Sequence, residues 1–422
     1  MQNKSKNFDV IVIGGGVAGL STALQLGRRG VKTLVVDRGA LGSGSTGRAA
    51  GLLGQLRGSI AATSMLMDGV KIVQDLEAQC QCEIFVQTGS LRIAETTERA
   101  GEIRDLVAMG KSIQFPIETL DAKQVAELLP YMKTDDLLDA CYCPTDGHLQ
   151  PAELTSAYIK AGRQAGVEYK TNCRVDSILN EKGKITGVQT EQGISHSPIV
   201  VNAAGPWSYL TAGSGDVILP TASIGHYYLT TRPDPEQTVD RKSPAVRDRH
   251  HRIYSRPESG GLIVGMYEAE PVEYDMERLP DDFDMSLMKV ARDDFNAALL
   301  IHAAQQRFPW INERTPMTLT TGIMTFTPDG KPFCGKMDNL EGLFHCTGFS
   351  GHGIVQSPVV GVIMADLILD GSTKYDIEAM EADRYYELPG FQTRSEIKSK
   401  CAAMYGSYYG RVERPEILSD SE

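Results

Sequence analysis

The stretch "FDVIVIGGGVAGL", residues 8–20, decides the fold of this chain. Its apolar run at residues 8–13 is typical of a central parallel strand that is buried on both faces. Gly14, Gly16 and Gly19 follow with the spacing Gly-x-Gly-x-x-Gly, and the apolar pattern after them predicts a helix. The next apolar run, "KTLVVD", predicts a second strand. The stretch therefore predicts a βαβ unit that binds a dinucleotide.

Each glycine of this motif has a physical role. Gly14 permits a sharp turn, Gly16 lets a pyrophosphate approach the backbone, and Gly19 lets the helix pack against the strand. Backbone N–H groups at the start of the helix are expected to hold the phosphates. Asp37 ends the second strand, where its carboxylate can accept hydrogen bonds from a ribose. This carboxylate would repel the 2′-phosphate of NADP, so the motif favours NAD or FAD.

Two further loops of small residues distinguish between NAD and FAD. One is "GSTGRAAG" at residues 44–51, and the other is "GFSGHG" at residues 348–353. FAD is longer than NAD and needs more small-residue backbone along its ribityl chain and ring. The hydroxyls of Ser45 and Thr46 are expected near the phosphates. The last loop starts a helix, whose N–H groups suit the flavin edge that becomes anionic on reduction. The three loops together favour FAD.

The residues expected to contact FAD lie in these loops and in the turns beside them. They are Gly14, Gly16, Val17, Ala18, Gly19, Asp37, Arg38, Ser45, Thr46, Arg48, Ala49, Ala50, Gly51, Leu52, Val175, Ala204, Gly205, Trp207, Gly348, Phe349, Ser350, Gly351, His352, Gly353 and Ile354.

The rest of the pattern predicts an α/β fold with a discontinuous Rossmann-type FAD-binding domain and an α+β substrate domain built on an antiparallel sheet. A cleft is expected between the two. The FAD-binding domain is expected at 1–80, 146–217 and 317–386, the substrate domain at 81–145 and 218–316, and a polar, irregular C-terminal tail at 387–422.

Composition narrows the class of protein. The 422 residues are 41% hydrophobic and carry a formal net charge of −12, which argues against nucleic acid or an anionic membrane as the main partner. No apolar run reaches the length of a membrane span, and no signal peptide is evident. The pairs Cys80/Cys82 and Cys141/Cys143 lack nearby further ligands, so no metal site is expected. We expect a cytoplasmic protein.

Several ordered motifs between about residues 8 and 410 resemble one known family. They include "VIGGGVAG", "GSTGRAAGL", "TGSLRIA", "DGHLQPAEL", "VNAAGPW", "GHYYLTT", "MTFTPDGKPFCG" and "CTGFSGHGI". The chain resembles the FAD-dependent oxidoreductases of the D-amino acid oxidase type, in the branch of dimethylglycine and sarcosine dehydrogenases. The tail "YGSYYG" resembles the segment at which those larger enzymes pass into a folate-binding module, and the sequence stops there. The resemblance implies oxidation of the C–N bond of a secondary or tertiary amine.

The chain departs from that family at sites of flavin attachment. In the dimethylglycine branch a histidine after "GST" carries the flavin covalently, and Arg48 stands in its place. In monomeric sarcosine oxidases a cysteine before "TPD" does so, and the matching place is near Gly322. The resemblance therefore implies non-covalent FAD. Glycine-oxidase-like relatives place a carboxylate-binding arginine near "PDGKP", but "TGIMTFTPDG" has none. A carboxylate clamp must come from elsewhere, or the substrate lacks that carboxylate.

Five side chains are candidates for catalysis. His352 lies in the turn that faces the flavin, or it only starts a helix. Tyr254 and Arg256 alternate on one strand, where they line the cleft with Arg256 gripping a carboxylate, or form an outer sheet face. His226 and Tyr228 alternate likewise, and they assist deprotonation of the amine or belong to the core.

Several functions remain open at this point. The first is an amine oxidoreductase acting on an N-methyl amino acid or cyclic imino acid, with oxygen, an electron-transfer protein or a quinone as acceptor. The second is the catalytic flavin subunit of a larger assembly, with a partner subunit or as a homo-oligomer. The third is a flavin-binding assembly factor without turnover. The sequence does not name the amine or the oligomeric state.

Overall fold

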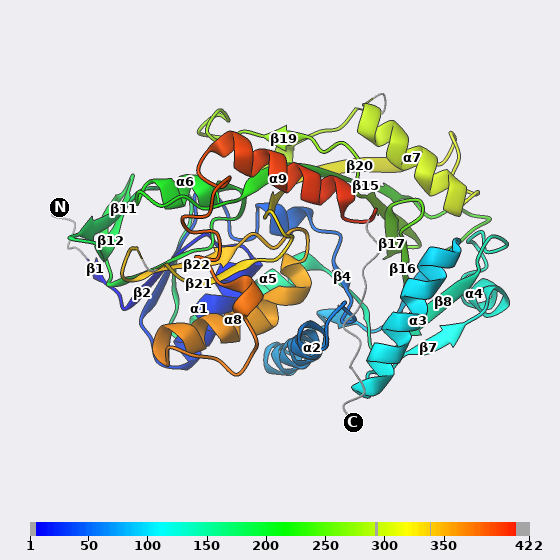
Figure 1. Cartoon of the computed structure of the whole chain (residues 1–422), viewed down its shortest axis with the longest axis horizontal. Helices are drawn as coiled ribbons and strands as arrows, with labels where there is room; N and C mark the ends of the chain where they lie inside the picture. Colours follow the sequence, from blue (N-terminus) through cyan, green and yellow to red (C-terminus); the bar gives the residue numbers. More distant parts are fainter. Residues whose placement is uncertain (1–5, 292–293, 338, 411–422) are drawn as a thin grey trace.

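The computed structural model describes residues 6–291, 294–337 and 339–410. Figure 1 shows two groups of elements side by side. A parallel sheet with its helices lies at the left and bottom, and a larger sheet lies at the top and right. The helix α7 (Phe295–Arg307) packs on one face of the larger sheet and α3 (Thr97–Ser112) on the other. The predicted fold class, a Rossmann-type domain beside an α+β substrate domain, is confirmed.

The parallel sheet is built from the short apolar runs that the sequence predicted as strands. Its strand order is β10 (Glu168–Lys170), β3 (Thr33–Val36), β2 (Val10–Ile13), β14 (Ile199–Asn202), β22 (Leu343–Thr347) and β21 (Phe333–Lys336). Neighbouring strands are parallel except at the edge, where β21 runs antiparallel to β22. Residues of β2 and β3 are buried on both faces, as continuous apolar runs require.

Two layers cover this sheet. Val10 and Val12 of β2 face a core formed with the helices α1 (Val17–Arg28), α2 (Ile60–Cys80), α5 (Pro151–Gln164) and α8 (Gly353–Leu369). Ile11 and Ile13 face the opposite core. That second core lies under a small sheet with the order β1 (Lys6–Asn7), β13 (Gly193–His196), β12 (Lys184–Thr190) and β11 (Val175–Glu181).

The larger sheet gives the molecule its second part. Its order is β19 (Glu273–Tyr274), β15 (Ala222–Thr231), β18 (Gly261–Met266), β17 (Ile253–Glu258), β16 (Ala245–Asp248), β6 (Ser90–Ala94), β8 (Asp139–Cys143) and β7 (Glu118–Leu120). The strand β20 (Met317–Phe326) also pairs with β15 over its whole length. Neighbours are antiparallel apart from β16 and β6. The sequence predicts that residues 317–326 belong to the FAD-binding domain. Their pairing with β15 places them in the larger sheet instead, which corrects the predicted domain boundary at residue 317.

The remaining elements connect and cover these sheets. They are the strands β4 (Leu52–Leu53), β5 (Phe85–Val86) and β9 (Gly147–Leu149), the helices α3 (Thr97–Ser112), α4 (Ala122–Leu128), α6 (Ser208–Gly213) and α7 (Phe295–Arg307), and the 3₁₀ turns η1 (Ser45–Arg48), η2 (Gly205–Trp207), η3 (Met285–Leu287) and η4 (Glu378–Met380).

The prediction of an irregular C-terminal tail at 387–422 is wrong for much of that segment. Residues Arg394–Ser407 form the helix α9, which begins with a capping box in which Thr393 and Glu396 exchange hydrogen bonds. Ile397, Cys401 and Tyr405 are buried in a core with residues of β15 and β20. The sequence of α9 is polar overall, so its composition did not indicate that one side of the helix is apolar. The rest of the expected tail, residues 411–422, lies outside the described residues.

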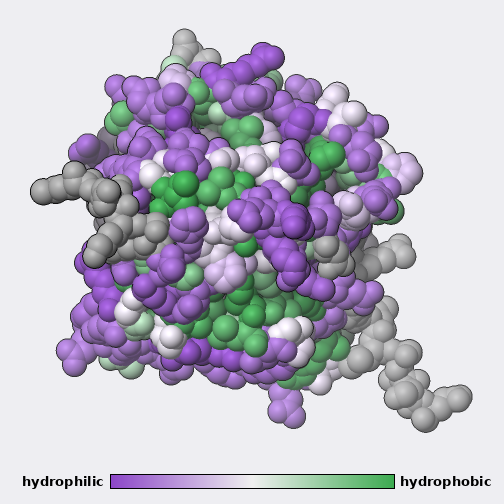
Figure 2. All heavy atoms as spheres, turned by 90° about the vertical axis from the view of Figure 1, so that its left-hand side faces the viewer, coloured by the Kyte–Doolittle hydropathy of each residue, from purple (hydrophilic) through white to green (hydrophobic). Residues whose placement is uncertain are grey.

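Hydrophilic side chains cover most of the face at the left-hand end of Figure 1. Figure 2 looks onto this face and shows hydrophobic side chains only in patches between them. In the part of the chain that the structure describes, no helix combines the length and apolar character needed to cross a bilayer.

Candidate active site

A cavity of about 870 Å³ lies between the parallel sheet and the larger sheet. All of the residues expected to contact FAD line it, except Gly19. The lining members are Gly14, Gly16, Val17, Ala18, Asp37, Arg38, Ser45, Thr46, Arg48, Ala49, Ala50, Gly51, Leu52, Val175, Ala204, Gly205, Trp207, Gly348, Phe349, Ser350, Gly351, His352, Gly353 and Ile354.

The first glycine loop is shaped by close backbone contacts. Gly14 has φ +107°, and a Cβ placed on it would lie 2.3 Å from the carbonyl oxygen of Ala203. A Cβ on Gly19 would lie 2.0 Å from the carbonyl oxygen of Gly14. Gly19 therefore brings α1 onto its strand, which explains why it does not line the cavity. The prediction that it contacts the cofactor is wrong, and its packing role remains.

The second loop is fastened to the first. The Thr46 hydroxyl accepts a hydrogen bond from the N–H of Val17, the first residue of α1, at 3.1 Å. The N–H of Gly42 donates to the carbonyl of Gly15 at 2.8 Å. Gly51 closes the loop with φ +78°, and a Cβ there would lie 2.1 Å from the carbonyl oxygen of Leu149. The two loops thus form one continuous small-residue wall.

We expect Thr46→Val to weaken FAD binding about tenfold. The valine keeps the shape of the side chain but leaves the buried N–H of Val17 without its acceptor, at a cost of about 1–3 kcal/mol. The Kd of FAD for the apoprotein, measured by quenching of FAD fluorescence, reports the change. Thr46→Ser keeps the hydroxyl and serves as the control. Equal Kd values for both variants and the wild type would contradict this role of the hydroxyl.

Asp37 and Trp207 line the end of the cavity that the parallel sheet forms, since Asp37 follows β3 and Trp207 follows β14. The Asp37 carboxylate accepts the N–H groups of Gly15 and Gly39, each at 2.7 Å. Burial raises the pKa of Asp37, while these hydrogen bonds act in the opposite direction. The Arg38 guanidinium lies 4.8 Å from the centre of the Trp207 ring. This end offers a carboxylate acceptor and a flat aromatic surface to a nucleotide.

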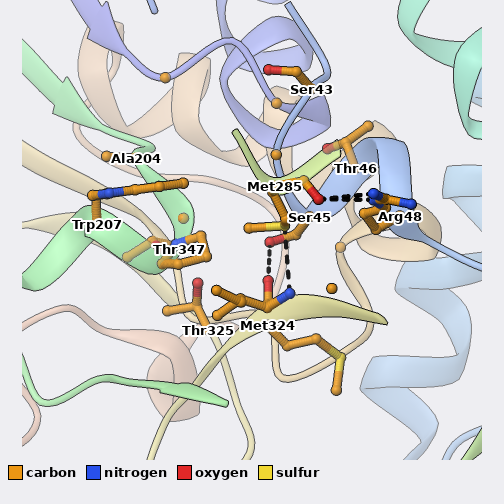
Figure 3. Close-up of a pocket in the computed structure, with 18 of the residues that line it drawn as sticks. Ser43, Ser45, Thr46, Arg48, Ala204, Trp207, Met285, Met324, Thr325 and Thr347 are labelled. Atoms are coloured by element: carbon orange, nitrogen blue, oxygen red, sulfur yellow. Dashed lines mark hydrogen bonds between the residues drawn. The ribbon is translucent and has the colours of Figure 1, made fainter. Parts of the chain in front are cut away.

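Arg48 reaches away from the second loop to the turn η3. Figure 3 shows its guanidinium directed at the Met285 carbonyl, to which Nε and Nη2 donate at 3.1 and 2.9 Å. A Cβ built on Gly322 would lie 2.7 Å from the Cβ of Arg48. Arg48 and Gly322 are therefore neighbours in the wall of the cavity.

The third loop turns sharply before α8. Gly348, Ser350 and Gly351 have φ of +75°, +47° and +86°. His352 follows, and its Nε2 lies 3.1 Å from the hydroxyl of Tyr408. Burial, followed by the charges of nearby arginines, lowers the pKa of His352 well below its ordinary value. His352 is therefore neutral at physiological pH and can serve only as a hydrogen-bonding group there.

A series of hydrogen bonds begins at the cavity wall on the side of the larger sheet. The Tyr405 hydroxyl donates to the carboxylate of Glu268, so its oxygen accepts from Nδ1–H of His226, at 2.9 Å. The Nε2 atom of His226 then accepts from the Tyr254 hydroxyl at 2.8 Å. Tyr254 and His226 line the cavity, while Glu268 is buried behind them. The series connects the cavity to an interior carboxyl group.

Burial shifts the pKa of two members of this series, His226 at its centre and Glu268 at its inner end. It lowers the pKa of His226 to about 3 and raises the pKa of Glu268 to about 7. One oxygen of Glu268, Oε1, is buried without a hydrogen-bond partner. A carboxyl group in this state can take up or release a proton near neutral pH.

Two predicted catalytic residues do not reach the cavity. Tyr228 and Arg256 are absent from its lining among the residues that the structure describes. Arg256 is 2% exposed, and its guanidinium pairs with Glu258 at 2.7 Å and donates to the carbonyls of Ala50 and Pro257. The prediction that Arg256 grips a substrate carboxylate is wrong, because its charge is already matched. Arg256 instead holds the second loop from behind.

Sequence reasoning missed several residues of this site. Tyr405 and Tyr408 belong to the segment that looked like a tail, and Arg247, Tyr267 and Tyr409 line the cavity near Tyr254. "YGSYYG" carried the missed signal, since three tyrosines so close together seldom belong to an exposed tail.

The cavity fits FAD on observations of this chain alone. Its length joins the Asp37 and Trp207 end to the larger sheet, and backbone of all three loops lines it where side chains would clash. A model of the FAD-dependent oxidoreductase family of the D-amino acid oxidase type matches residues 9–367. The chain belongs to this family. The predictions of FAD as cofactor and of an oxidoreductase are thereby confirmed.

Relatives of this FAD-dependent oxidoreductase act on amines and amino acids. Mitochondrial sarcosine dehydrogenase of Mus musculus is 30% identical over 96% of this chain and 44% of the relative. Mitochondrial dimethylglycine dehydrogenase of Rattus norvegicus is 28% identical over 94% and 47%. The chain thus spans less than half the length of these two relatives. L-proline dehydrogenase from P. horikoshii shares the fold, with a TM-score of 0.80 over 90% of this chain and 98% of that one, at 24% identity.

Proposed function

We propose that this chain oxidises the C–N bond of a secondary or tertiary amine, with an N-methyl amino acid or a cyclic imino acid as substrate. The observation that carries the proposal is the cavity that joins the three small-residue loops to Tyr254 and His226. The sarcosine and dimethylglycine dehydrogenases among the relatives support this substrate class.

FAD held by these loops would supply the oxidant, taking one hydride (a proton with two electrons) from a carbon next to the amine nitrogen. The chain's own residues must hold that nitrogen neutral, because a protonated amine lacks the lone pair that forms the new C=N bond. The Tyr254 oxygen can accept the amine proton while Tyr254 passes its own to Nε2 of His226. Tyr405 and Glu268 extend the path away from the cavity. Water then hydrolyses the iminium product outside this series.

The remaining polar groups have binding roles in this proposal. Thr46 and the backbone of the first loop would hold the phosphates, and the Asp37 carboxylate would accept from the ribose. The Ser45 hydroxyl donates to the carbonyl of Ile323, so it fixes the second loop and has no proton left for a phosphate. The N-terminus of α8 would face the flavin edge that gains negative charge. Arg48 and Gly322 offer neither an imidazole nor a thiol to the ring, which supports non-covalent FAD.

Anaerobic addition of amines to the purified holoprotein tests this function. Sarcosine, dimethylglycine, L-proline and glycine are added separately while the visible flavin band is followed. We expect bleaching by an N-methyl or cyclic amino acid, and expect acid precipitation to leave the yellow colour in solution. A flavin that dithionite reduces but that no amine in this panel bleaches would count against amine oxidation. Colour in the precipitate would count against non-covalent binding.

A further inference from the structure

Arginine side chains converge on the wall of the cavity beside Tyr254. In the register of the larger sheet, Arg247 of β16 is the cross-strand neighbour of Tyr254 of β17 on one side and of Arg92 of β6 on the other. Cross-strand partners point to the same face of a sheet, with Cβ atoms about 5 Å apart. Arg247 and Tyr254 both line the cavity. A cationic side chain thus stands next to the tyrosine that the proposed function assigns to the amine.

Arg57 adds a second cation behind Arg247. Its Nη1 atom donates to the carbonyl of Leu56 at 2.8 Å, while its Nη2 atom is buried and has no hydrogen-bond partner. Among the described residues, neither Arg57 nor Arg247 forms an ion pair with a carboxylate. A buried guanidinium N–H without an acceptor is costly, so the site is electrostatically incomplete as it stands.

The neighbouring carboxylate does not balance these charges. Asp146 lies close to Arg247, since both approach the place where a Cβ on Gly54 would sit, at 3.4 and 3.0 Å. Its oxygens already accept from the backbone and side chain of Gln55 and from Ser90. Burial, and then the charge of Arg247, lowers the pKa of Arg57 to about 10. Positive charge therefore exceeds negative charge at this place.

This excess positive charge lies close enough to the third loop to act on a residue in it. The charges of Arg57 and Arg247 both act on His352, in the turn before α8. The cations therefore lie at the substrate end of the cavity and not at the end with Asp37. Among the described residues that line the cavity, Arg247 is present and Arg57 is not, so an anionic group there would contact Arg247 and be attracted by the charge of Arg57 behind it.

We propose that Arg247, supported by Arg57, binds the carboxylate of an amino acid substrate. The proposal rests on the proposed function and makes it narrower, because it selects amines that carry a carboxylate on or near the reacting carbon over simple amines. A guanidinium presents parallel N–H groups that match both oxygens of a carboxylate. With the carboxylate on Arg247, the amine of an α-amino acid falls toward Tyr254, its cross-strand neighbour.

A binding experiment tests this subsite without turnover. Methoxyacetate has the shape of sarcosine with an ether oxygen in place of the amine, so it cannot form an iminium. Methoxyacetamide is its neutral counterpart. Each is titrated into the holoprotein, and its Kd is read from the shift of the visible flavin spectrum. We expect wild-type protein to bind the carboxylate at least tenfold more tightly than the amide.

Substitutions of single arginines test which residues cause the preference for the carboxylate over the amide. Arg247→Gln is expected to weaken methoxyacetate binding about 10- to 100-fold, the worth of charge-assisted hydrogen bonds, and to leave the amide unchanged. Arg247→Lys should restore part of the preference, and Arg57→Gln should lower it less than Arg247→Gln does. The exposed Arg314, replaced by glutamine, controls for loss of a surface charge. Thermal midpoints of all variants show whether they fold.

The outcomes separate this subsite from the proposed oxidation. An Arg247→Gln protein that folds, binds FAD and keeps the wild-type preference for the carboxylate would overturn the subsite, as would equal binding of both probes by the wild type. If the preference depends on Arg247 but no amine bleaches the flavin, the subsite stands and the oxidation fails. If amines bleach the flavin and neither arginine substitution changes the preference for the carboxylate, the proposed oxidation stands and the proposed subsite fails.

Discussion

Replacing His226 by asparagine is expected to slow reduction of the flavin by the amine substrate about 100-fold, the low end of what a positioned acid–base group contributes. Asparagine cannot accept the proton of Tyr254 and pass another to Tyr405, so the hydrogen-bonded series is interrupted at its centre. Stopped-flow absorbance of the flavin band under anaerobic conditions measures the rate. FAD content should stay unchanged, since the His226 side chain lies on the larger sheet.

His302→Asn is the matched control, because His302 is exposed on α7 and outside the cavity lining. It should reduce at the wild-type rate. If the His226→Asn protein also reduces its flavin at that rate, the series carries no proton in the rate-determining step. A tenfold change in KM with an unchanged limiting rate would assign His226 to binding alone.

The same series predicts a pH dependence. Burial keeps His226 neutral above about pH 3, so it contributes no inflection near neutral pH. Glu268 has a pKa of about 7 and accepts a proton only when ionised, so the reduction rate should rise as pH passes through 7. Glu268→Gln should abolish this rise. Because the folded-state pKa of Glu268 is raised, its contribution to stability is lost as pH rises through 7, and Glu268→Gln should spare the protein that loss.

Replacing Arg307 by methionine is expected to destabilise the protein by about 3–5 kcal/mol, the cost of leaving buried carboxylates without their partner. Arg307 is fully buried at the end of α7, where it contacts Glu95, Asp136 and Asp248. His251 lies against Asp248 at 2.8 Å and shares the same network. The network ties α7 to strands of the larger sheet, so its loss should loosen the wall that carries Arg247.

The thermal midpoint of unfolding, followed by circular dichroism, measures this effect. Arg314→Gln, a change of the same charge seven residues further on at an exposed position, should leave the midpoint within about 1 °C because surface charges contribute little. A midpoint for Arg307→Met that matches this control would show that the carboxylates find other partners or take up protons.

Local patterns were sufficient to predict which small-residue loops line the cavity. The glycines of the first loop stand between a strand and a helix only a few residues away, so their geometry follows from nearby sequence. The second and third loops were recognised in the same way. The hydrogen bond from the N–H of Val17 to the Thr46 hydroxyl was not predicted, although both residues were expected to contact FAD.

The substrate end required information that alternation along one strand does not contain. Alternation placed Tyr254 and Arg256 on one face, but it did not show that the cavity ends before Arg256 or that Glu258 pairs with it. Arg247 depends on the register between β16 and β17. Tyr405 depends on α9 packing against distant strands, which no local pattern reveals.

The order of strands in the parallel sheet has a consequence for how the protein is made. β14 lies between β2, near the start of the chain, and β22, near residue 347, so the centre of the sheet joins segments from all thirds of the chain. During synthesis on the ribosome, the wall around the first glycine loop is complete only after β22 and the third loop, up to residue 353, have been made. Such long-range pairing slows folding to the order of milliseconds to seconds or longer. A nascent chain therefore exposes an unfinished nucleotide site until that point, and FAD can be captured only afterwards.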